Sequence, residues 1–87
     1  MTEKVELAKL KGCKTDAEQL CKIGEEFGEV IEAYREYKQT GCPEHFKEEM
    51  LDLMQASFTM LHKVGYTAED NINHLRKMEV YKVTKNY

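Results

Sequence analysis

Two segments of this 87-residue chain carry the same arrangement of carboxylates. Residues 25–33 and 48–56 both read Glu-Glu-x-x-(Glu/Asp)-apolar-apolar-x-Ala. In an α-helix, side chains three residues apart point within about 60° of each other. Glu26 and Glu29 therefore share one flank of a helix, as do Glu49 and Asp52, and in each helix the pair lies beside the apolar stripe. If the two helices pack antiparallel through these stripes, the two carboxylate pairs converge.

Four converging carboxylates repel one another unless they stay protonated or a cation holds them. An all-oxygen site of this kind suits a hard ion, Mg²⁺ first and Mn²⁺ as a substitute. A di-iron site of the ferritin type would need Glu-x-x-His, and no histidine follows a glutamate by three residues. A single acidic helix face is usually just solvated. The duplication at the same angle to the apolar stripe favours a metal site instead.

The paired motifs resemble a known signature. Glu25-Glu26-x-x-Glu29 followed by Glu49-x-x-Asp52 is similar to the motif of the MazG-like, all-α nucleoside triphosphate pyrophosphohydrolases. This superfamily includes dimeric dUTPases, dCTP pyrophosphatases and phosphoribosyl-ATP pyrophosphatases, and the resemblance covers about residues 20–77. Carried over by position, it implies magnesium ligands at Glu26, Glu29, Glu49 and Asp52. It also implies that Glu25 orients a ligand or assists the attacking water. The implied reaction cleaves between the α- and β-phosphates and gives a monophosphate and pyrophosphate.

A triphosphate substrate also needs basic partners, which gather towards the end of the chain. Lys77 occupies the position of a lysine found in family members, but Tyr81 stands where they often carry an arginine. Lys82 and Lys85 are the expected substitutes for it. A solvated basic helix end, favoured by the helix dipole, is the alternative interpretation. The sequence has no Gly-rich loop, which excludes a P-loop as the phosphate site.

Helix-start and helix-stop residues divide the chain into three helices, at about residues 15–39, 43–63 and 67–84. Thr15 and Thr67 are suited to N-cap the first and third helices, whereas Gly41 and Pro43 mark the break before the second. No segment alternates with period two, so we expect no sheet. The first twelve residues are expected to add at most a short helical turn. We predict one all-α domain over residues 1–87, an antiparallel bundle of three main helices.

The apolar residues of the first helix form a seam with spacings of 3 and 4, typical of helix packing. Its members are Leu20, Ile23, Phe27, Val30, Tyr34 and Tyr37. The second helix adds an apolar flank at Met54, Phe58 and Leu61. Together these surfaces exceed what two helices of one small chain can cover. We therefore predict a homodimer or homotetramer that completes the bundle.

Composition excludes several other classes of protein. With 13 basic and 16 acidic residues, the net charge of −3 argues against nucleic acid as a partner. No apolar stretch approaches ~18 residues, so we expect no membrane interaction, no export and a cytoplasmic location. His45, His62 and His74 lack any common spacing and are interpreted as surface or capping residues. Two alternatives stay open: a narrower activity on dUTP, dCTP or phosphoribosyl-ATP, and a catalytically silent helical oligomerisation module.

Overall fold

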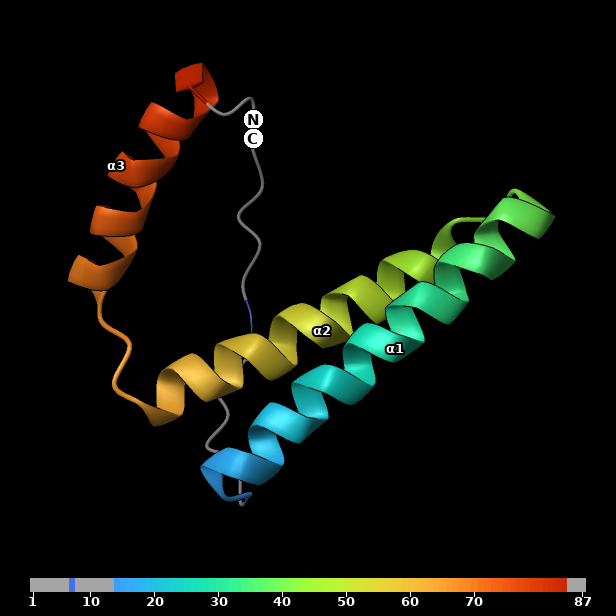
Figure 1. Cartoon of the computed structure of the whole chain (residues 1–87), viewed down its shortest axis with the longest axis horizontal. Coiled ribbons are helices and arrows are strands. Elements are labelled where there is room, and N and C mark those ends of the chain that lie inside the picture. The colour runs from blue at the N-terminus through green and yellow to red at the C-terminus, as the bar shows by residue number, and fades with distance from the viewer. Residues whose placement is uncertain (1–6, 8–13, 85–87) are drawn as a thin grey trace.

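The computed structural model describes residue 7 and residues 14–84, and this part of the chain is all helical, with no strand. Its helices are α1 (Asp16–Thr40), α2 (Glu44–Lys63) and α3 (Ala68–Thr84) (Figure 1). The all-α prediction is confirmed, and every helix end lies within one residue of its predicted position. The helical turn expected in the first twelve residues lies outside the described residues, apart from Leu7, which is not in a helix.

Side-chain caps explain where the helices begin and end. The Thr15 hydroxyl accepts a hydrogen bond from the backbone N–H of Glu18 at 3.2 Å, and the Glu18 carboxylate accepts one from the backbone N–H of Thr15 at 3.0 Å. This reciprocal capping box starts α1. Gly41 ends α1 with φ 76°, a left-handed conformation that glycine adopts without strain. Thr67 and Asp70 exchange the same two hydrogen bonds before α3.

α1 and α2 form an antiparallel hairpin whose contact is built from small side chains (Figure 1). Ala33 and Ala56 are buried in it together with Val30. The side-chain amide of Gln19 donates a buried hydrogen bond to the carbonyl oxygen of Ala56 at 3.0 Å. Small residues let the two backbones approach closely, and the buried core of the hairpin is correspondingly thin. The predicted antiparallel packing of the first two helices is therefore present.

α3 packs against neither α1 nor α2 within the part of the chain that the structure describes (Figure 1). None of the residues of α3, all of which are described, is buried, and its Ile72, Leu75 and Val80 are each about half exposed. The expected antiparallel bundle of three helices does not form within one chain. The physical reason is the sparse apolar face of α3, whose apolar residues are separated by polar ones and leave little surface to bury against the hairpin.

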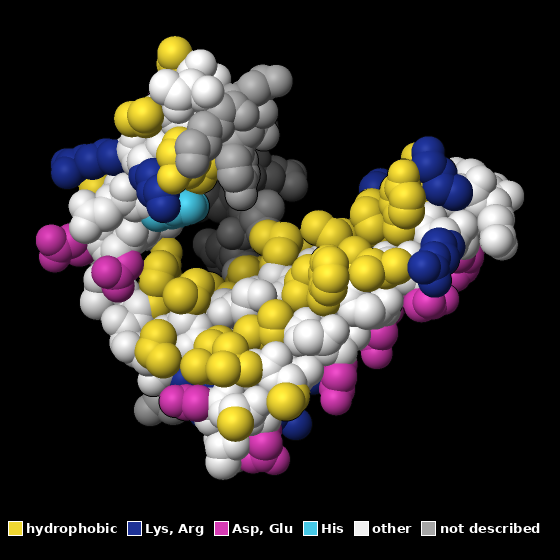
Figure 2. Space-filling model, in the orientation of Figure 1, with side chains coloured by type: hydrophobic (Ala, Val, Ile, Leu, Met, Phe, Trp, Pro, Cys, Tyr) yellow, Lys and Arg dark blue, Asp and Glu magenta, His cyan; other side chains and the backbone are white. Residues whose placement is uncertain are grey.

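The hairpin has one apolar and one acidic face. At 3.6 residues per turn, most of the exposed apolar residues of both helices lie about 70° or more from the α1–α2 contact, on the same side of the hairpin, whereas Leu51 lies on the other side. We call this the apolar face: Leu20, Phe27, Ile31, Tyr34, Met50, Met54 and Leu61. Hydrophobic side chains run along both helices in Figure 2, with acidic side chains at the outer edge of α1. The predicted seam is thus split, because α2 covers Val30 fully but leaves Leu20, Phe27 and Tyr34 exposed.

The acidic side chains occupy the opposite face. By the same helical geometry, Glu25, Glu29 and Glu32 of α1 lie on the side of the hairpin that carries Glu48 and Asp52 of α2. We call this the acidic face. No described helix combines the length and the apolar character needed to cross a bilayer.

Candidate metal centre

Three of the four predicted ligands meet at the α1–α2 contact, at its edge towards the acidic face. Glu26 of α1 and Glu49 and Asp52 of α2 each present a carboxylate oxygen, and these oxygens lie within 4.8 Å of one another. An octahedral Mg²⁺ separates neighbouring ligand oxygens by about 3 Å and opposite ones by about 4 Å. Small side-chain rotations would therefore bring this set to coordination distance.

Glu26 is buried more deeply than the sequence indicates. We expected the carboxylate pairs beside the helix contact, but Glu26 lies within it and is only 5% exposed. Oε2 of Glu26 and Oε2 of Glu49 are both buried without a hydrogen-bond partner among the described residues. A buried, unpartnered carboxylate oxygen carries its full desolvation cost. A cation between the two carboxylates would remove that cost at both, so the donor set fits a divalent ion.

Glu29, the fourth predicted ligand, is electrostatically part of the same group. A side-chain hydrogen bond with Glu49 raises the pKa of the Glu29 carboxyl above its ordinary value, and the charge of Glu26 raises it further. Such a shift is what neighbouring carboxylates produce, because each disfavours the charged form of the other. The structure therefore brings three of the four predicted ligands together, and Glu29 lies close enough to Glu49 and Glu26 to be affected by both.

Two basic side chains hold the ligand carboxylates, and the sequence analysis missed both. Lys22 Nζ lies 2.6 Å from Glu26 Oε1, and His45 Nε2 lies 3.1 Å from Glu49 Oε1. The other ring nitrogen of His45 lies 3.0 Å from Glu36 Oε2, and this hydrogen bond is the main reason that the pKa of His45 is raised. His45 is therefore more than the surface or capping residue that we expected, because it links both helices at the predicted ligand Glu49.

A sequence signal for these two residues exists. The offset of 23 residues that superposes the two motifs also places Lys22 over His45, each four residues before the glutamate that it contacts. The repeated segment therefore begins about one helical turn before Glu26 and Glu49, with a basic residue at the first position of each copy. A basic residue at that spacing supports a helix by itself, which is why it does not stand out before the packing is known.

An open groove of about 750 Å³ lies on the acidic face beside the ligands. Its lining residues are Glu25, Gly28, Glu29, Glu32, His45 and Glu49. Glu25, the predicted catalytic residue, is therefore exposed on a groove that it shares with two of the ligands. The volume falls within the range of about 300–1,000 Å³ common for small-molecule sites. Because the lining is rich in carboxylates, an anionic ligand would need accompanying cations to bind there.

The predicted phosphate-binding lysines lie elsewhere. Lys77 Nζ stands 5.3 Å from the centre of the Tyr81 ring, and Lys82 Nζ lies 3.2 Å from a carboxylate oxygen of Glu79. Both belong to α3, which does not pack on the hairpin, so one chain does not bring them to the carboxylates. Lys85 lies outside the described residues.

Among known proteins, no family model, no curated sequence and no solved structure matches this chain.

Proposed function

We propose that this chain is a Mg²⁺-dependent nucleoside triphosphate pyrophosphohydrolase that releases a nucleoside monophosphate and pyrophosphate. The proposal depends above all on one observation, the pair of buried and unpartnered oxygens on Glu26 and Glu49. They come from opposite helices, with Asp52 within reach of both. The resemblance of the paired motifs to the MazG-like signature supplies the reaction type.

The residues of the site have distinct roles in this proposal. Glu26, Glu29, Glu49 and Asp52 would hold the ion, which when bound neutralises phosphate oxygens and lowers the pKa of a water molecule. Glu25, exposed on the same groove, is suited to accept the proton of the attacking water. Attack at the α-phosphorus breaks its bond to the bridging oxygen, and pyrophosphate leaves with that oxygen. His45 keeps the Glu49 carboxylate oriented through its hydrogen bond.

Product analysis tests the reaction. The purified chain is incubated in ¹⁸O-water with a panel of triphosphates, including dUTP, dCTP and phosphoribosyl-ATP, with and without Mg²⁺. We expect Mg²⁺-dependent formation of pyrophosphate and of a monophosphate that carries the label. Orthophosphate with a diphosphate would mean γ-phosphate hydrolysis and would overturn the proposal. Turnover of one member of the panel alone would favour the narrower activity.

A silent oligomerisation module is the second candidate, and the exposed apolar face together with the unpacked α3 favours it. Such a module would need neither Mg²⁺ nor a nucleotide. It predicts that millimolar Mg²⁺ leaves the thermal unfolding temperature unchanged and that no triphosphate in the panel is cleaved. An enzyme with the proposed centre predicts the opposite in both measurements.

We further propose that the chain works as a homodimer or homotetramer. The buried apolar core of the hairpin consists of Val30, Ala33 and Ala56, which is small even for a chain of this length. A second copy can cover the apolar face with its own, since a two-fold axis pairs identical surfaces. The acidic faces then point outward, so each metal centre keeps its four ligands in one chain. α3 is free to reach the neighbouring copy, and Lys77 and Lys82 would contact phosphate there.

A further inference from the structure

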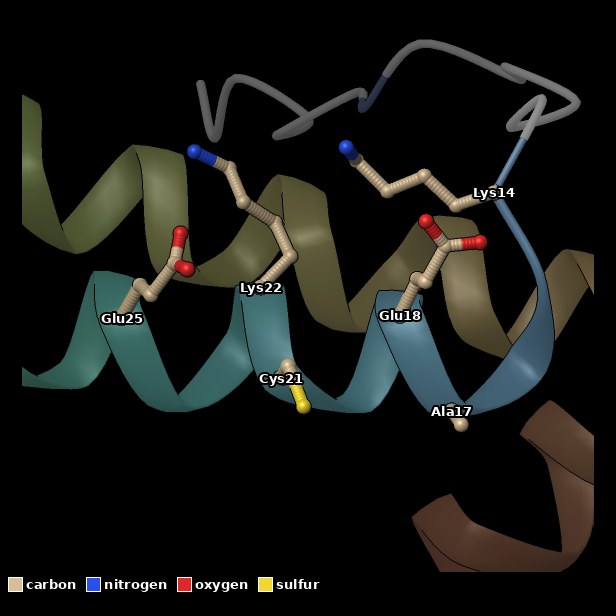
Figure 3. Close-up of a pocket in the computed structure, with 6 residues that line it drawn as sticks. All are labelled: Lys14, Ala17, Glu18, Cys21, Lys22 and Glu25. Atoms are coloured by element: carbon tan, nitrogen blue, oxygen red, sulfur yellow. The ribbon is translucent and has the colours of Figure 1, made fainter.

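Lys22 lies between a buried carboxylate and an open concavity. Its Nζ is 2.6 Å from Glu26 Oε1, while 40% of its side chain remains exposed. Lys14, Glu18 and Glu25 line a concavity of about 300 Å³ together with Lys22. Figure 3 shows that Lys14 and Lys22 extend on the same side of α1 as these two carboxylates. Rotation about its own side-chain bonds would therefore move Nζ from Glu26 towards solvent beside Glu25.

A divalent ion on Glu26 would change the surroundings of Lys22. The ion would place two positive charges within a few ångströms of Nζ, doubling the repulsion that a single charge would exert at that distance. Glu26 Oε2, now without a partner, would turn to the ion and reduce the attraction that holds the ammonium group. The ion pair between Lys22 and Glu26 would therefore weaken when the metal binds, and Nζ would be released into the concavity.

We propose that Lys22 is a substrate-binding residue that neutralises Glu26 before the metal arrives and binds a phosphate oxygen of the substrate afterwards. This inference rests on the proposed function. The groove beside the ligands is lined by four glutamates, whereas Lys77 and Lys82 of the same chain stand on the unpacked α3. His45 is less suited to the task, because both of its ring nitrogens are engaged by carboxylates. Lys22 is bound to a ligand and also open to solvent, so it can serve both states.

Metal binding by the Lys22→Gln variant tests the first half of the proposal. Free Mn²⁺ is measured by electron paramagnetic resonance as the ion alone is titrated into the full chain. Removing a competitor for Glu26 should tighten Mn²⁺ binding by about two- to fivefold, the equivalent of a partly exposed (i, i+4) ion pair. Lys47→Gln is the matched control, because Lys47 pairs with Glu44 on the surface of α2 and its loss removes the same charge. Equal or weaker Mn²⁺ binding by Lys22→Gln would overturn the proposal.

Phosphate binding tests the second half. The Mn²⁺ complex of inorganic triphosphate is titrated calorimetrically into protein saturated with Mn²⁺. Lys22→Gln should weaken binding by about tenfold or more, the loss of one charge-assisted hydrogen bond, whereas Lys22→Arg should keep most of it. Unchanged triphosphate binding by a Lys22→Gln variant of normal helix content would overturn the proposal. Neither titration requires turnover, so a chain that binds both ligands but hydrolyses nothing defeats the proposed reaction alone. A wild-type chain that binds no Mn²⁺ defeats both.

Discussion

At the scale of single residues, the candidate metal centre combines two opposing conditions, because it places negatively charged carboxylates where they are buried. Glu26 and Glu49 lie where α1 and α2 meet, a position at which most helix pairs place apolar side chains. Lys22 contacts one oxygen of Glu26, and His45 contacts one oxygen of Glu49. The second oxygen of each carboxylate is buried without a hydrogen-bond partner among the described residues. The burial of these two carboxylates therefore costs free energy, which a bound cation would reduce.

Glu49→Gln should remove the effect of Mg²⁺ on stability. For the wild-type chain, Mg²⁺ at a hundred times its dissociation constant adds about 2.7 kcal/mol to the free energy of unfolding. The neutral amide is a poor ligand, so the variant should gain almost nothing and should release no pyrophosphate. Urea unfolding with and without Mg²⁺ measures the first effect. Glu48→Gln, one residue earlier on the exposed side of α2, should respond to Mg²⁺ like the wild type; retained Mg²⁺ stabilisation in Glu49→Gln would remove Glu49 from the centre.

Glu26→Met should raise the free energy of unfolding of the metal-free chain and abolish Mn²⁺ binding. An apolar side chain of similar length replaces a buried carboxylate with an unpartnered oxygen, which removes a desolvation cost of about 1 kcal/mol or more. Lys22, left without its partner, is 40% exposed and can be hydrated. Urea unfolding in metal-free buffer should therefore show a higher free energy of unfolding, while Mn²⁺ binding is lost. A variant less stable than the wild type under these conditions would mean that the ion pair with Lys22 outweighs the desolvation of Glu26.

The sequence indicates the four candidate ligands more clearly than it indicates the residues that contact them. Glu26, Glu29, Glu49 and Asp52 stand out because a spacing of three repeats at one angle to the apolar stripe on both helices. The depth of Glu26 does not follow from that pattern, since it depends on how far α1 rotates towards α2. The role of His45 was missed for a similar reason: its contact with Glu36 exists only because the helices run antiparallel.

At the scale of elements, local chemistry sets the helix ends and long-range packing sets the arrangement. Thr15 and Gly41 act within a few residues of their own positions, so the ends of α1 could be predicted from the sequence. The placement of α3 could not, because it depends on surfaces far along the chain or on another copy. The spacing of its apolar residues correctly predicts a helix, but it does not indicate which surface packs against them.

The capping box at the start of α1 should make the free energy of unfolding depend on pH. The backbone N–H of Thr15, and then its hydroxyl, lower the pKa of Glu18 below its ordinary value of 4.5. A lowered folded-state pKa stabilises the fold above the unfolded pKa, and this contribution is lost as the pH falls through the folded value. The wild type should therefore be more stable than Glu18→Gln at pH 7, and the difference should shrink below about pH 4.5. Urea unfolding at several pH values measures it.

A second variant and a second outcome of the pH series test the role of the Glu18 charge. Thr15→Ser keeps a hydroxyl at the cap and should show the same pH dependence as the wild type. A difference between wild type and Glu18→Gln that stays constant from pH 7 to pH 3 would show that the capping box does not act through the charge of Glu18.

At the scale of the whole molecule, the apolar face should decide the state of assembly. Ile31 lies on this face of α1, away from the predicted metal ligands. Ile31→Glu would place a charge in the proposed contact between copies, where desolvation is costly, and should yield a monomer in sedimentation equilibrium at micromolar concentration. Gln39→Glu adds the same charge to an exposed position off the face and should leave the assembly intact. A wild-type chain that is already a stable monomer would contradict the proposed dimer.

The small residues buried at the α1–α2 contact, among them Ala33 and Ala56, have a consequence for how the hairpin finds its register. Two smooth helix surfaces joined by small residues can slip past each other with little steric resistance, and one turn of slip moves a helix by about 5.4 Å. That shift is larger than the 4.8 Å that spans the oxygens of Glu26, Glu49 and Asp52. Only one alignment of α1 with α2 therefore presents all three oxygens to a single ion. An ion bound there would stabilise this alignment relative to those shifted by one turn, and would thereby fix the register of α1 against α2.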